Sequence, residues 1–161
     1  MGGLQEGSRW LRDQRQQTYV EYLDLLVALI RTFGVGMRVS KFGGQTAINS
    51  GHDFKGVDEA FNNLMDDLHH LEQRLELIVG DNVWSAKQKV DDLILSILDA
   101  RDDEDIIEYE WDEIQEEGWD LLSELQKAMR AELGVKSTAA KRREIGRIVV
   151  AARPQSHESA D

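Results

Sequence analysis

The stretch that decides the fold is FKGVDEAFNNLMDDLHHLEQRLELIVGDNVWSAKQKVDDLILSILDA, residues 54–100. In both halves of this stretch, apolar residues recur every three or four positions, which is the period of a helix buried along one side. A connection of about three residues, starting at Gly80, separates the two patterns. The sequence therefore predicts helices over 54–79 and 83–100 that are antiparallel neighbours, with Gly80 just beyond the end of the first.

Two further amphipathic patterns flank this stretch. The first covers residues 8–33 and the second covers 104–133. Gly118 interrupts the apolar side of the second pattern, where the missing side chain lets another helix approach closely. Four amphipathic helices joined mainly by short turns predict an all-α fold, an antiparallel four-helix bundle over residues 1–134.

The connection between the first and second predicted helices is much longer than the others. It covers residues 34–53, contains five glycines and begins with Gly34, where we expect the first helix to end. A loop of this length inside a compact domain is usually functional or mobile. It also carries apolar side chains, and Phe42 is a candidate for contact with a partner.

Charge divides the chain into an acidic body and a basic tail. Residues 1–133 hold 13 Lys and Arg against 28 Asp and Glu, a balance of −15, whereas residues 134–161 hold six against three, a balance of +3. The tail, residues 135–161, is expected to form a short helix over 138–152 and to be disordered after that. Its clustered Arg142 and Arg143 are candidates for contact with an acidic surface.

Composition excludes several classes of protein. The chain has 161 residues, which suits a single domain, and no Cys, which excludes disulfide frameworks, thiolate metal sites and a Cys nucleophile. Its net charge of −12 argues against nucleic acid as a partner of the body. No membrane-spanning run and no signal peptide are visible, so a cytoplasmic protein is expected.

The densest acidic stretch is DDEDIIEYEWDEIQEEGWD, residues 102–120, with eleven carboxylates and no Lys or Arg. Within it, Glu117-Gly-Trp-Asp120 resembles the E-x-x-D element of all-α NTP pyrophosphohydrolases. The resemblance implies Mg²⁺ as the cofactor and Glu113, Glu117 and Asp120 as candidate catalytic residues. The first element of that family lies on a preceding helix, whereas its counterpart here, Glu110-x-x-Glu113, lies on the same helix. The helical wheel places Glu113 and Asp120 nearly opposite the core and Glu117 at its flank, although a catalytic Mg²⁺ needs convergent ligands.

The same acidic helix has two simpler interpretations. Its outer face, which includes Asp112 and Glu116, is either solvated or a docking surface for a basic partner. The chain's own basic tail is a candidate for the basic partner of this face.

The start of the first helix carries charged residues where apolar ones are expected. Arg12 and Arg15 lie on the side of the helix that forms the core further along, so this end extends past the core or meets another surface. Trp10 lies beside them. Trp10, Trp84 and Trp119 fall away from the centres of their apolar sides, and exposed aromatics are typical of interfaces.

The segment WLRDQRQQTYVEYLDLL, residues 10–26, resembles the opening of small uncharacterised actinobacterial helical-bundle proteins, with a Trp/Arg-rich start and a Y-x-x-[YF]-L first helix. Residues 128–134, AMRAELG, are similar to their R-x-E-L-G end. The resemblance covers the first and last helices and implies a helical bundle without a known activity. Such proteins often begin with a membrane segment, for which residues 1–8 are too short and too rich in Gly.

Together these patterns predict a non-enzymatic helical module without a cofactor that binds a protein partner or self-associates. Two alternatives stay open. One is the Mg²⁺-dependent pyrophosphohydrolase. The other is the soluble part of a membrane-associated protein at the cytoplasmic face, touching the membrane only through its N-terminal end or its basic tail.

Overall fold

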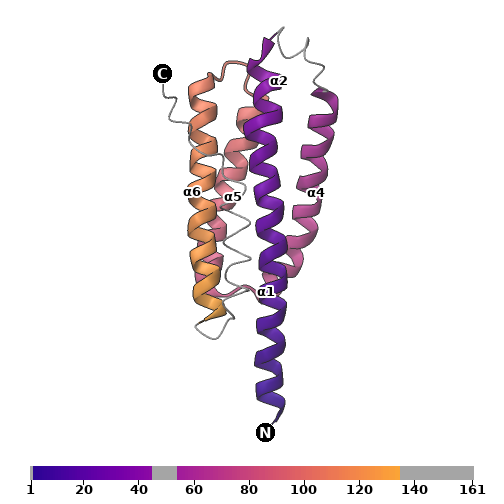
Figure 1. Cartoon of the computed structure of the whole chain (residues 1–161), viewed down its shortest axis with the longest axis vertical. Coiled ribbons are helices and arrows are strands. Elements are labelled where there is room, and N and C mark those ends of the chain that lie inside the picture. The colour runs from indigo at the N-terminus through magenta and orange to yellow at the C-terminus, as the bar shows by residue number, and fades with distance from the viewer. Residues whose placement is uncertain (1, 45–53, 135–161) are drawn as a thin grey trace, which may run out of the picture.

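The computed structural model describes residues 2–44 and 54–134, and within them the chain is all-helical, as predicted. Four long helices make up the fold (Figure 1): α1 Gly2–Arg31, α4 Phe54–Ile78, α5 Asp81–Asp102 and α6 Glu108–Leu133. A π-helical segment and one short helix follow α1 directly: η1 Thr32–Met37 and α2 Arg38–Phe42.

The four helices share one hydrophobic core. The closest pairs are α5 with α6 and α1 with α4, and α1 also packs on α6. The buried side chains are those of the apolar periodicity, for example Leu26, Phe61, Leu93 and Leu122. The periodic patterns in the sequence therefore mark the sides of the helices that are removed from water.

Gly118 lies at a close approach between helices, as the sequence predicted. A Cβ atom at this position would lie 3.1 Å from Ile30 Cδ1 and 3.3 Å from Leu93 Cδ2. The absence of a side chain on α6 therefore lets α1 and α5 approach it.

The predicted boundaries of the first helix were wrong at both ends. The helix begins at Gly2 rather than at residue 8, because extending an existing helix adds a hydrogen bond per residue without a new nucleation cost. The loop expected to begin at residue 34 does not begin there, since the chain stays helical through Phe42. Buried Phe33 and Met37 give this segment a core contact that overrides its glycines. Residues 45–53 of the predicted loop lie outside the described residues.

The two turns also differ in detail from expectation. Gly80 follows α4, but with φ −88° and ψ 171° it is extended and serves as the N-cap of α5. The helix predicted from residue 104 begins at Glu108, because Asp103 Oδ1 accepts a 2.9 Å hydrogen bond from the Asp105 amide and forms a local turn. Ile106 buries its side chain inside this connection.

Among the helices of the described residues, none is both long enough and apolar enough to cross a membrane. The tail, with its predicted helix over 138–152, lies outside the described part of the chain.

Candidate interaction surface

Helix α1 is fixed to the C-terminal ends of α4 and α6 by a polar junction. Arg15 Nε donates a 2.6 Å hydrogen bond to the carbonyl oxygen of Ile78, at the last turn of α4. Tyr19 Oη donates to the Glu132 carboxylate of α6. Burial, and then this bond to an anion, raise the pKa of Tyr19. The junction marks where the packed part of α1 begins.

Before Arg15, α1 extends past the ends of the other helices (Figure 1). We call this part, Gly2–Gln14, the overhang. From Gly7 to Asp13 every described side chain is exposed except that of Leu11, which is half-buried. A Cβ atom added at Gly7 would meet nothing within 4 Å. The overhang is therefore a helix without a helical neighbour among the described residues.

Among the candidate interaction residues at the start of α1, Trp10 and Arg12 lie on the overhang, whereas Arg15 does not. Trp10 is 60% exposed, the side chain of Arg12 is exposed, and neither Arg9 nor Arg12 forms an ion pair within the described residues. Arg15 instead belongs to the junction, where its guanidinium satisfies a carbonyl at the end of α4.

The candidates Phe42 and Asp112 lie far from this junction and are engaged within the chain. Arg38 contacts Glu108 at 2.6 Å and Asp112 at 2.8 Å. The hydrogen bond to Asp112 is the main reason why the pKa of Arg38 is raised. Phe42 packs edge-on against Trp111, with 5.6 Å between ring centroids. Both residues therefore hold helices together.

Trp111 explains why the helix continues past residue 33. Its ring stacks on Phe33 at 4.0 Å between centroids, and its Nε1 donates a 3.0 Å hydrogen bond to the Phe33 carbonyl oxygen. A side-chain donor at this place satisfies a backbone acceptor where the wider π turn disturbs the regular pattern. The sequence placed Trp111 on the apolar side of its helix but gave no sign of this bond.

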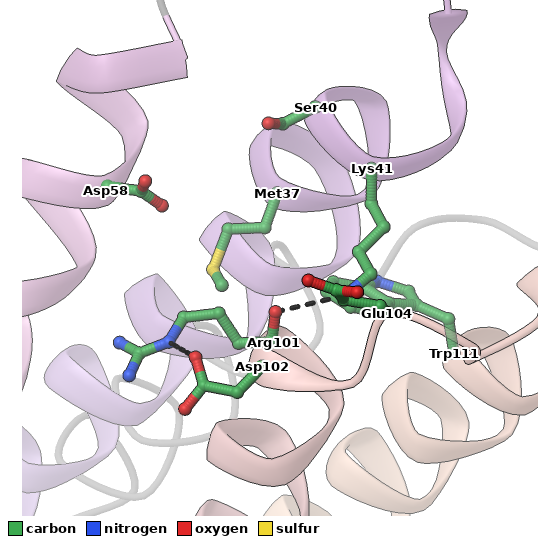
Figure 2. A pocket seen from close by; sticks show the side chains of 8 residues that line it. All are labelled: Met37, Ser40, Lys41, Asp58, Arg101, Asp102, Glu104 and Trp111. Carbon is green, nitrogen blue, oxygen red and sulfur yellow. Dashed lines mark hydrogen bonds and ion pairs between the residues drawn. The ribbon is translucent and has the colours of Figure 1, made fainter.

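A pocket of about 520 Å³ lies beside this stacked pair (Figure 2). Its two cations are already used, because Lys41 Nζ donates to the carbonyl oxygens of Ala100 and Arg101 at 3.2 and 3.0 Å, and Arg101 Nε donates to Asp102 at 3.1 Å. Lys41 thus caps the end of α5. Both cations of this pocket are therefore engaged by groups of the chain itself within the described residues.

The carboxylates proposed for Mg²⁺ all face outward. Glu113, Glu117 and Asp120 are exposed on α6, while Gly118 and Trp119 between them are buried. In the described residues, no group of three or more His, Cys, Asp and Glu is arranged to hold a metal ion. The structure therefore does not bring these carboxylates together with those of another helix. Glu116 is exposed on the same helix.

A buried polar cluster escaped sequence reasoning. Lys87 is only 3% exposed, and its Nζ lies 2.9 Å from Asp91 Oδ2 and 3.9 Å from Glu72 Oε1. Burial raises the pKa of Glu72, against the opposing effect of Lys87. Tyr22 Oη is buried without a hydrogen-bond partner among the described residues, and burial raises the pKa of Tyr22. The sequence signal for this cluster is that Lys87 occupies an apolar position of the helical pattern, between Val83 and Val90.

The tryptophans behave differently from one another. Trp10 and Trp84 are exposed, whereas the expectation that Trp119 is exposed was wrong, because it is fully buried. Helix α6 packs against both α5 and α1, so it buries a wider arc than the centre of its apolar side. Arg142 and Arg143 lie outside the described residues.

No protein-family model, curated protein or solved structure matches this chain. The functional argument therefore rests on the surface of the molecule itself, and the overhang is its most distinctive part.

Proposed function

We propose that this chain is a non-enzymatic interaction module, an antiparallel four-helix bundle that presents the overhang to a protein. The observation that carries the proposal is Trp10, which is 60% exposed on the part of α1 that has no helical neighbour among the described residues. Connections of two residues between α4 and α5 and of five between α5 and α6 support the antiparallel arrangement.

The composition of the overhang supports a role in binding. Trp and Arg are the residue types most enriched among those that dominate binding energies, and Arg9 and Arg12 flank Trp10. A Trp side chain offers roughly 150–250 Å² of surface for burial. Most of the Trp10 side chain is exposed to water unless a partner covers it.

The charged groups elsewhere support the same interpretation. Lys87, Arg38 and Lys41 each join two helices, through Glu72, Asp112 and the end of α5 respectively. These three cations thus contribute to the packing of the described helices, whereas Arg9 and Arg12 form no ion pair within the described residues.

The proposal is tested by photocrosslinking in cells that express the full chain. A photoreactive aromatic amino acid replaces Trp10 in one variant and Trp84, which is 39% exposed in the first turn of α5, in the matched control. We expect a discrete protein adduct from position 10 and none from position 84, with the adduct identified by mass spectrometry.

Two outcomes would contradict the proposal. Adducts of equal yield from both positions would mean that the overhang has no special contact. Absence of protein adducts, together with flotation of the unmodified chain on vesicles of anionic lipid that Trp10→Ala abolishes, would assign the overhang to a membrane surface instead.

A further inference from the structure

We propose that the overhang binds the overhang of a second copy of this chain, with the two helices antiparallel across a two-fold axis. This inference rests on the proposed function and names its partner. The argument uses the charges on the overhang, the charge of the bundle and the length of the unpartnered helix.

The charges on the overhangs of two copies are complementary only when the two helices run antiparallel. Arg9 and Asp13 are four residues apart and share one side of α1, with Trp10 next to that side. Across a two-fold axis between antiparallel helices, Arg9 of each copy faces Asp13 of the other. In a parallel pair in register, Arg9 would face Arg9 and Asp13 would face Asp13.

The charge of the bundle selects the same orientation. The chain has a formal net charge of −12, and its carboxylates are concentrated beyond the overhang. An antiparallel pair places the two acidic bundles at opposite ends of the dimer. A parallel pair would place them side by side, where like charges repel.

The second copy also fits better than an anionic lipid surface. Such a surface would attract Arg9 and Arg12 but would repel Asp13, which is exposed among them. A second overhang offers both signs of charge in the order required. A two-fold pair is also closed, so that association stops at the dimer.

The size of the contact predicts a weak dimer. The overhang has 13 residues, Gly2–Gln14, and at 1.5 Å per residue it is about 20 Å long. One face of so short a helix pair falls below the ~1,200 Å² of total buried surface that marks stable interfaces. The dimer is therefore expected to dissociate on dilution and, because ion pairs contribute, on addition of salt.

The experiment measures association of the full chain by sedimentation velocity over a wide range of concentrations. We expect a monomer–dimer equilibrium that Trp10→Ala weakens at least about tenfold and that Trp84→Ala leaves unchanged. Arg9→Asp is expected to weaken it several-fold, and Arg9→Asp combined with Asp13→Arg is expected to restore it. Because the overhang packs on no other helix within the described residues, urea denaturation of the Trp10 and Arg9 variants should match that of the parent chain at a concentration where all are monomeric.

Orientation is measured with spin labels, for which the absence of Cys in the chain is convenient. Ser8→Cys places a label on the overhang, about 200° around the helix from Trp10, and Ser40→Cys places one at the exposed position of α2. In the antiparallel dimer the two labels at position 8 are within about 30 Å, whereas those at position 40 are about 90 Å apart. Short distances at both positions would overturn the antiparallel arrangement.

A chain that stays monomeric at every concentration would overturn the inference. If position 10 still crosslinks to a different protein, the proposed function stands while the second copy is excluded. If both experiments fail, the overhang has no protein partner and both statements are wrong.

Discussion

Glu132 and Val83 join the end of one helix to the beginning of another, since Glu132 Oε1 accepts a 3.0 Å hydrogen bond from the Val83 amide. Glu132 Oε2 accepts a second bond, of 3.2 Å, from the Gly80 amide. Amides in the first turn of a helix have no partner within it, so α5 obtains its cap from α6. A carboxylate also interacts favourably with the positive end of the helix dipole.

Glu132→Ala is expected to lower the free energy of unfolding by about 2 kcal/mol. The substitution leaves the Val83 and Gly80 amides and the Tyr19 hydroxyl without their acceptor. Glu132→Gln keeps one oxygen and should lose about half as much. Urea denaturation measures both values.

Glu124→Ala is the matched control on the same helix. Its exposed carboxylate contacts Lys89 at 3.4 Å, and exposed ion pairs contribute little to stability. A loss for Glu132→Ala no larger than that for Glu124→Ala would show that the junction does not stabilise the bundle.

The tyrosines are expected to titrate in two groups. Burial is the main reason why the pKa of Tyr19 and of Tyr22 is raised, whereas Tyr109 is exposed and its pKa is raised mainly by a hydrogen bond with Glu113. Because the native state holds these two protons more tightly than the unfolded state, stability is constant below the ordinary tyrosine pKa of about 10 and falls as the pH rises past it. Tyrosinate absorbance should therefore report Tyr109 first, and the other two only when circular dichroism shows unfolding. Ionisation of all three with the helices intact would contradict this.

Glu72→Gln is expected to stabilise the protein at pH 7. A raised carboxyl pKa means that the native state binds the proton more readily than the unfolded chain, so the ionised form of Glu72 costs stability at neutral pH. This cost disappears as the pH falls below the unfolded value of about 4.3. Melting temperatures at pH 7 and pH 4 should therefore show a gain for Glu72→Gln that shrinks on acidification.

Asp91→Asn is the contrasting change in the same cluster. Asp91 is the close partner of buried Lys87, at 2.9 Å, and its removal leaves a buried ammonium whose other carboxylate is 3.9 Å away. We expect a loss of about 2 kcal/mol, since Asp91 is itself partly exposed. If Glu72→Gln and Asp91→Asn change the stability equally, the two carboxylates do not differ in their contribution beside Lys87.

Periodicity was sufficient to predict the helices, because burial along one side of a helix leaves a pattern in the residues of that helix alone. The polar contacts could not be predicted in the same way. The bond from Trp111 to the Phe33 carbonyl, and that from Glu132 to α5, each depend on two segments far apart in the chain. The loop predicted from residue 34 failed for this reason, since the partner that keeps the segment helical lies on α6.

Candidate interaction residues followed the same division. Trp10 and Arg12 were found from the sequence because they break the apolar pattern of their own helix. Asp112 and Phe42 were equally good candidates from the sequence, but Asp112 pairs with Arg38 and Phe42 packs against Trp111. A sequence shows which side chains leave the core of a helix, but not which of them another helix then covers.

Gly118→Ala is expected to lower the free energy of unfolding by about 1 kcal/mol. Its Cβ would lie 3.1 Å from Ile30 and 3.3 Å from Leu93, both buried, so overpacking outweighs the gain in helix propensity. Gly7→Ala is the matched control, because nothing lies within 4 Å of its added Cβ, and it should raise stability by up to about 1 kcal/mol. Urea denaturation compares the two at a concentration where the chain is monomeric. A stabilising Gly118→Ala would mean that α1 and α5 move apart easily, and that the close approach of the helices does not require glycine.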